Sequence, residues 1–160
     1  MSRTIRPLTE ADHPLLEQFL YGAVFQPPGT EPIPYEVIFQ PEVHLYIDRF
    51  DPQNTPGDLA SVAEQDGVII GIAWTRVIPA FGHIDAETPE LAISVLPEYR
   101  NQGVGADLMA HLFAQLRAKG YTHTSLAVQK ANPACRFYQR LGYEIVKDKD
   151  EEWLMRKELY

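Results

Sequence analysis

Residues 95–105 read Val-Leu-Pro-Glu-Tyr-Arg-Asn-Gln-Gly-Val-Gly and contain the strongest structural signal in the chain. An apolar strand runs into Pro97, and the glycines at 103 and 105 open a helix. This order gathers free backbone N–H groups at a helix N-terminus, where the helix dipole also favours negative charge. The stretch therefore predicts a turn that binds an anionic group, such as a phosphate.

Two common phosphate-binding motifs do not describe this turn. The dinucleotide fingerprint needs a third small residue where this chain has Leu108, and no Gly-Lys-Ser/Thr follows as in a Walker A loop. A Gly-x-Gly pair alone also fits a tight strand-to-helix turn without a ligand. The surrounding sequence must therefore distinguish an anion-binding turn from a purely structural one.

The segment that follows the glycines has a clear helical period. Val104, Leu108, Leu112 and Leu116 recur every fourth residue, and Gly120 is suited to end the helix in a left-handed conformation. We predict a helix over residues 104–119.

Working outward, the remaining patterns predict a mixed α/β (α+β) sheet with the order β-α-α-β-β-β-α-β-α-β-β. Thr9 with Asp12 forms a capping box for the first helix, and residues 35–50 show a looser helical pattern. Asn132 and Pro133 begin a short helix that ends at Gly142. The expected strands span residues 4–7, 59–64, 68–77, 90–96, 124–128, 143–147 and 153–157, and the main loops span 27–34 and 79–89.

Composition limits the class of protein. With 160 residues, 45% of them apolar, the chain can bury one core, so a single domain over 1–160 is expected. The net charge of -8 argues against nucleic acid or an anionic membrane as the main partner. The longest apolar run, 68–75, is too short to span a bilayer, no signal-peptide pattern precedes it, and Cys135 is the single cysteine. We therefore expect a cytoplasmic protein.

Two sequence blocks together resemble the GNAT superfamily of N-acetyltransferases. The first reads Arg100-Asn101-Gln102-Gly103-Val104-Gly105 after a strand that ends in Val-Leu-Pro. The second, residues 132–143, reads Asn-Pro-Ala-Cys-Arg-Phe-Tyr-Gln-Arg-Leu-Gly-Tyr. The predicted order of elements is also similar to the fold of this family.

The resemblance implies acetyl-CoA as the cosubstrate. The pyrophosphate would lie on backbone N–H groups of the turn, and the pantetheine arm would pair with the fourth strand in a splay between that strand and 124–128. Asn132 would contact CoA, although its spacing from Tyr138 fits a plain N-cap equally well. The implied cofactor-binding residues are Ile93, Ser94, Val95, Arg100, Asn101, Gln102, Gly103, Val104, Gly105, Asn132 and Tyr138.

The resemblance also nominates catalytic residues. Tyr138 would protonate the departing CoA thiolate as general acid, whereas the alternative is that it only belongs to the apolar face of its helix. For the general base, Glu90 leads slightly because it adjoins the fourth strand. Glu87, Asp85, His83 and a water molecule remain open.

Other chemistry has weaker support. The five histidines show no metal-ligand spacing, so no metal is expected, and Cys135 fits a small buried residue better than an acyl carrier. The acceptor is expected to be an amine on a small molecule or peptide, held near residues 26–34, the second helix and 79–89. A catalytically silent acyl-CoA-binding or interaction module is the alternative function, and a homodimer stays open.

Overall fold

The computed structural model describes residues 2–160, which form a seven-stranded sheet in the order β1-β2-β3-β4-β5-β7-β6. Neighbouring strands are antiparallel except β4 and β5, which are parallel. The strands are β1 (Arg3–Pro7), β2 (Leu59–Gln65), β3 (Val68–Arg76), β4 (Glu90–Val95), β5 (His123–Gln129), β6 (Glu144–Lys149) and β7 (Glu152–Glu158).

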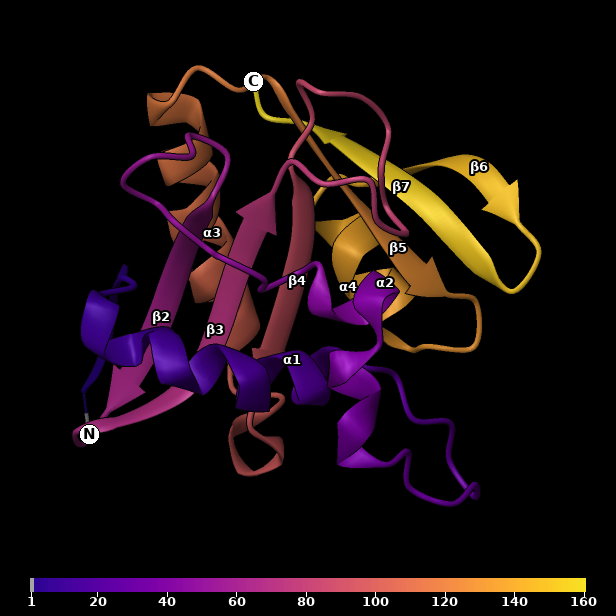
Figure 1. The fold of residues 1–160 in the computed structure, drawn as a ribbon, viewed down its shortest axis with the longest axis horizontal. Coiled ribbons are helices and arrows are strands. Elements are labelled where there is room, and N and C mark those ends of the chain that lie inside the picture. Colours follow the sequence, from indigo (N-terminus) through magenta and orange to yellow (C-terminus); the bar gives the residue numbers. More distant parts are fainter. Residues whose placement is uncertain (1) are drawn as a thin grey trace.

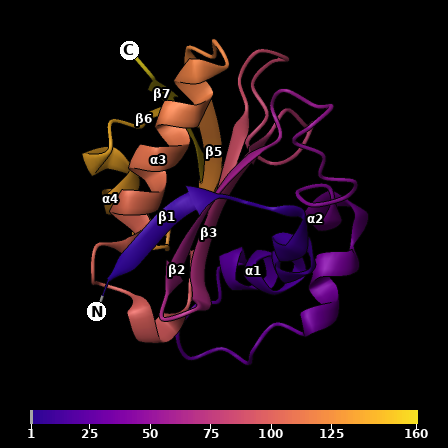
Figure 2. The ribbon, with the colours of Figure 1, turned by 90° about the vertical axis from the view of Figure 1, so that its left-hand side faces the viewer.

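Helices cover both faces of the sheet. Figures 1 and 2 show α1 and α2 on one face and α3 and α4 on the other. The helices are the 3-10 turns η1 (Glu10–Leu15), η2 (Tyr35–Phe39) and η3 (Pro97–Tyr99), and the α-helices α1 (Leu16–Ala23), α2 (Pro41–His44), α3 (Val104–Ala118) and α4 (Ala134–Arg140). The predicted order of elements and the mixed sheet are confirmed.

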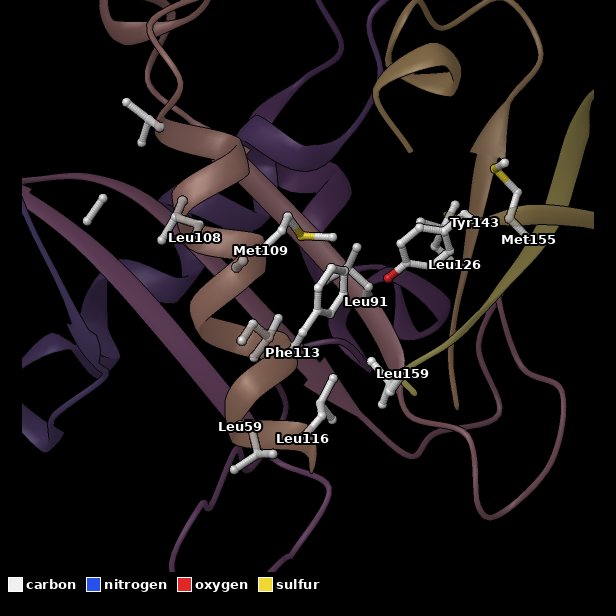
Figure 3. Close-up of a cluster of buried hydrophobic side chains, with 14 of the residues drawn as sticks. Leu59, Leu91, Leu108, Met109, Phe113, Leu116, Leu126, Tyr143, Met155 and Leu159 are labelled. Carbon is white, nitrogen blue, oxygen red and sulfur yellow. The ribbon is translucent and has the colours of Figure 1, made fainter. Parts of the chain in front are cut away.

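Each face of the sheet has its own apolar core. In Figure 3 the α3 side chains Leu108, Met109, Phe113 and Leu116 lie in one cluster with Leu91 of β4. The second core, under α1, is built around Trp74 and other fully buried side chains of β2 and β3. Alternate residues of β4 therefore face opposite helical layers, as the period of two in a strand requires.

Local chemistry explains where the elements differ from prediction. The Thr9–Asp12 capping box is present, but the first helix begins as η1, which contains Pro14, and becomes α-helical only at Leu16. The 35–50 segment divides into η2 and α2, with Pro41 at the start of α2. β6 and β7 extend further toward each other than expected, because Asp150 adopts a positive φ of 67° and makes a tight turn possible.

The parallel strands β4 and β5 separate almost at once. Their only paired residues in the described chain are Glu90 and Ser125, with Ser125 N–H also donating to Pro89 C=O at 3.0 Å. Beyond this pair, toward Val95, the edge of β4 that faces β5 has no strand partner. The expected splay is thus confirmed, and we call it the β4–β5 split. Among residues 2–160 no helix is long and apolar enough to cross a membrane.

Candidate functional site

The turn between β4 and α3 has the backbone geometry that an anion site needs. Asn101 and Gly103 have positive φ angles of 60° and 81°, and the latter is the N-cap of α3. The helical hydrogen-bond ladder begins with Asp107 N–H donating to Gly103 C=O at 3.1 Å. The N–H groups of Val104, Gly105 and Ala106 precede this bond and are free of the ladder.

Side chains of the same turn bond to its own backbone. Arg100 Nε donates to Val95 C=O at 3.0 Å, and Gln102 Nε2 donates to Glu98 C=O at 3.1 Å. Both side chains therefore hold the turn in shape. The groups available to an anion are the backbone N–H groups and the terminal nitrogens of the exposed Arg100, which bond to none of the described residues.

The two glycines of the turn serve different purposes. A side chain at Gly103 would meet nothing closer than Arg3 Nη2 at 3.9 Å, but the positive φ favours glycine there. A Cβ at Gly105 would lie 3.1 Å from the Phe137 ring of α4. Gly105, which the sequence nominated only for cofactor binding, therefore also has a packing role: its missing side chain lets the two sequence blocks touch.

The β4 residues nominated for the pantetheine arm turn their side chains away from the split. Ser94 is 7% exposed and packs toward Gly22 of α1, whereas Ile93 and Val95 pack into the core beneath α3. At the strand edge, Ile93 and Val95 present backbone groups to the split, although Val95 C=O already accepts from Arg100 Nε. Ser94 lies opposite Ile72 and turns its backbone groups to β3, because Leu96 N–H, two residues on, bonds to Ile70 C=O and the pattern alternates.

Glu90 lies at the apex of the split and is only 2% exposed. Its Oε2 accepts hydrogen bonds from Gly82 N–H at 2.9 Å and from the Tyr46 hydroxyl at 3.0 Å, and its Oε1 accepts from Ala80 N–H at 3.1 Å. Burial raises the pKa of the Glu90 carboxyl, while these donors and His83 oppose that rise. A buried carboxyl with a raised pKa at a strand junction suits proton transfer.

The other candidates for the general base are not buried at the split as Glu90 is. Asp85 is exposed, and its Oδ1 accepts from Glu87 N–H and the Thr88 hydroxyl, which holds its pKa below the ordinary value. Glu87 is exposed, and His83 bonds through Nδ1 to Ile78 C=O at 3.0 Å. Glu90 is the one member of this group that is buried at the split.

Tyr138 is half-buried on α4, with its ring centroid 5.5 Å from that of Phe137 and 5.9 Å from that of Tyr143. Burial raises the pKa of its hydroxyl, which therefore stays protonated and able to donate near neutral pH. The ring packs against the α3-side core, as expected of a residue on the apolar face of its helix. This packing does not account for the hydroxyl.

A cavity of about 310 Å³ opens at the start of α4, lined by Lys130, Asn132, Cys135, Arg136 and two neighbours. Asn132 Oδ1 accepts from Ala134 N–H at 2.9 Å and so holds the start of α4 from one residue before its N-cap, Pro133, rather than as the N-cap itself. Asn132 also borders the cavity. Burial raises the pKa of the Cys135 thiol, so it is a poor nucleophile.

Sequence reasoning missed Tyr46. It follows α2 in a segment of weak periodicity, 44 residues before Glu90, and no motif marks it. Only the folded chain brings its hydroxyl to the carboxylate.

Comparison with known proteins agrees with this geometry. The profile of the Acetyltransferase (GNAT) family matches residues 26–143. A mycothiol acetyltransferase of Kocuria rhizophila is 35% identical over 97 residues, which is 59% of this chain and 31% of that protein. The aligned part of this chain thus spans about a third of the length of the curated relatives it matches.

Solved structures share the fold. PaiA N-acetyltransferase from Thermoplasma acidophilum, in complex with coenzyme A, superposes with a TM-score of 0.73 at 21% identity, covering 99% of both chains. YncA from Salmonella typhimurium, solved with acetyl-CoA, gives 0.70 at 21% identity over 100% of this chain and 95% of that one. The family match covers both sequence blocks and the β4–β5 split, and on that match the chain belongs to the acetyltransferase (GNAT) family.

Proposed function

We propose that this chain transfers the acetyl group of acetyl-CoA directly to an amine. The observation that carries the proposal is the β4–β5 split, whose strand edge is unpaired beyond Glu90 and leads to the turn with free N–H groups. A strand edge can accept an extended arm, and the turn can accept a pyrophosphate. One ligand of the length of CoA engages both.

Relatives support the donor. The PaiA and YncA structures, which share this fold, were solved with coenzyme A and acetyl-CoA respectively. In our proposal the backbone of Ile93 and Val95 pairs with the pantetheine arm. The N–H groups of 101–106 bind the pyrophosphate, since the Arg100 N–H already donates to Pro97 C=O at 3.3 Å. The cavity at Asn132 would take a further part of the nucleotide.

Acetyl-CoA supplies an activated thioester, and the protein supplies one group that accepts a proton and one that donates a proton. Glu90 Oε2 or Oε1 accepts a proton from the attacking amine, directly or through water, as the amine nitrogen bonds to the carbonyl carbon. Tyr138 donates its hydroxyl proton to the sulfur as the carbon–sulfur bond breaks. The remaining rate enhancement comes from holding the amine and the thioester next to each other at the split.

The amine would approach from the side of the 78–89 loop and η2. Phe39 and Tyr35 of η2 are exposed at 53% and 43%, and Phe81 of the loop is exposed at 41%. Lys149 Nζ of β6 donates to Phe81 C=O at 2.6 Å. With the net charge of -8, these aromatic side chains favour an uncharged or cationic molecule or peptide that carries the amine.

Thiol release from acetyl-CoA across a panel of amines tests this function. We expect at least one amine to raise thiol release well above buffer, with the acetylated amine found by mass spectrometry. Binding of CoA without turnover for every amine class would instead favour a silent CoA-binding module.

A further inference from the structure

The carboxylate of Glu90 is held by a tyrosine from a distant part of the chain. Tyr46 lies between α2 and β2 in sequence, and its hydroxyl donates to Glu90 Oε2 at 3.0 Å. Burial is the largest cause that raises the pKa of Tyr46, followed by the charge of Glu90, so the phenol keeps its proton and acts as a donor.

The backbone of Tyr46 is fixed from the neighbouring strand. Trp74 Nε1, on β3, donates to Tyr46 C=O at 2.9 Å. Arg76, two residues further along β3, donates from Nη1 to Leu45 C=O at 2.9 Å and to Asp48 C=O at 2.5 Å. These bonds flank Tyr46 on both sides, so little freedom is left for its ring.

Each carboxylate oxygen of Glu90 thus has a defined donor. The 78–89 loop supplies the Ala80 and Gly82 N–H groups, and the helical layer supplies Tyr46. The other charged groups nearby are His83 of the loop and Arg76, the cross-strand neighbour of Glu90, which is paired with Asp58 at 3.0 Å.

We propose that Tyr46 is the positioning residue for Glu90, orienting the carboxylate toward the acceptor amine at the apex of the split. This inference rests on the proposed function, in which Glu90 is the base. Tyr46 stabilises the ionised form because it donates a hydrogen bond to a charged acceptor. Loss of the hydroxyl therefore makes the carboxylate harder to ionise and less well oriented.

The test compares Tyr46→Phe with a matched control, Tyr21→Phe. Tyr21 lies on α1 in the same helical layer, but its hydroxyl donates to Ile33 C=O and not to a carboxylate. In Tyr46→Phe we expect the Glu90 pKa, measured by ¹³C NMR of labelled glutamate with Glu90→Gln for assignment, to rise by about one unit. Tyr21→Phe should leave it unchanged.

Kinetics give a second readout. The acidic limb of the kcat/KM profile should move to higher pH by the same amount in Tyr46→Phe, with KM for acetyl-CoA unchanged, because the donor site is untouched. An unmoved NMR titration and an unmoved limb, in a variant that melts cooperatively, would overturn the role of Tyr46. If Tyr46→Phe does not fold, 3-fluorotyrosine at position 46 keeps the ring and makes the hydroxyl a stronger donor, so the Glu90 pKa should fall; an unchanged pKa would overturn the role of Tyr46.

The two proposals fail differently. If no amine is acetylated by the wild-type chain, the proposed function is wrong, yet the NMR titration still reports whether Tyr46 controls Glu90. If turnover is normal and the titration does not respond to Tyr46→Phe, only the positioning role is wrong.

Discussion

At the scale of single residues, the account depends most on Tyr138. Tyr138→Phe removes one hydroxyl and keeps the ring that packs on the core, so CoA affinity should stay the same. Because general acids contribute roughly 10²-fold or more, kcat should fall by about that factor. Steady-state thiol release with the best amine, beside calorimetric CoA affinity, measures both quantities.

Tyr143 provides the matched control. Its ring neighbours Tyr138, but its hydroxyl is buried and makes no well-formed hydrogen bond among residues 2–160, since the nearby Thr124 hydroxyl donates to Pro89 C=O at 2.8 Å. Tyr143→Phe should leave kcat unchanged and should raise the unfolding free energy by up to about 1 kcal/mol, since an unpaired buried hydroxyl is costly. Equal loss of kcat in both variants would show that packing, not proton donation, explains the effect at Tyr138.

The residues of the site differ in how far sequence predicts them. Gly103 and Tyr138 stand in motifs, so local spacing was sufficient to nominate them. Glu90 had only a slight lead, because nothing in the sequence separates a buried carboxyl from the exposed Asp85 and Glu87. Tyr46 had no signal, because its role arises from a contact across 44 residues that only the tertiary fold creates.

At the scale of elements, the 78–89 loop and β5 must approach closely. A Cβ at Gly82 would lie 2.9 Å from the backbone of Leu126 and Ala127 and 3.0 Å from Glu90 Oε2. Gly82→Ala should therefore push the loop off β5 and weaken the Gly82 N–H bond to Glu90, costing about 1–3 kcal/mol of stability.

Urea unfolding measures this change, and the substitution should also lower kcat. Ala86→Ser, on the exposed part of the same loop, should change neither quantity. Full stability and activity in Gly82→Ala would contradict the close approach.

The elements themselves were largely predictable. Regular periods predicted α3 and most strands. Asp-Gly between two strand patterns is typical of a hairpin, and Asp66 and Gly67, with φ angles of 52° and 79°, do form the turn between β2 and β3. The short 3-10 pieces and the full lengths of β6 and β7 were not predictable. The first and last residues of these elements depend on the backbone conformation around the prolines and on cross-strand pairing, and both are determined by the folded chain.

At the scale of the whole molecule, a buried ion pair links β3 to the segment that enters β2, and its arginine also donates to the backbone that follows α2. Arg76 bonds to both oxygens of Asp58, at 3.0 and 3.1 Å, and Asp58 is 1% exposed. Arg76→Met would leave the Asp58 carboxylate buried without its cation. We expect a loss of about 3–5 kcal/mol in unfolding free energy, measured by urea denaturation.

A more exposed pair gives the comparison. Arg3→Met breaks the bond between Arg3 and Asp107, whose side chains are 23% and 51% exposed, and should cost less than about 1 kcal/mol. Similar losses in the two variants would mean that the buried pair does not hold these segments together.

The arrangement of the whole molecule was predictable in outline, and the acceptor side was not. The resemblance to the GNAT superfamily implied the splay between the fourth and fifth strands. The proposed acceptor side draws on η2 and the 78–89 loop, which are distant in sequence and share no motif, so no local pattern predicts where the amine would bind.

The central claim is that CoA binds along the β4–β5 split with its pyrophosphate on the turn before α3. Amide hydrogen exchange with and without CoA tests this directly, because N–H groups outside the helical ladder exchange readily until a ligand bonds them. We predict slower exchange in peptides covering 93–95 and 101–106 at saturating CoA. Saturable binding that leaves exchange in both segments unchanged would contradict the account.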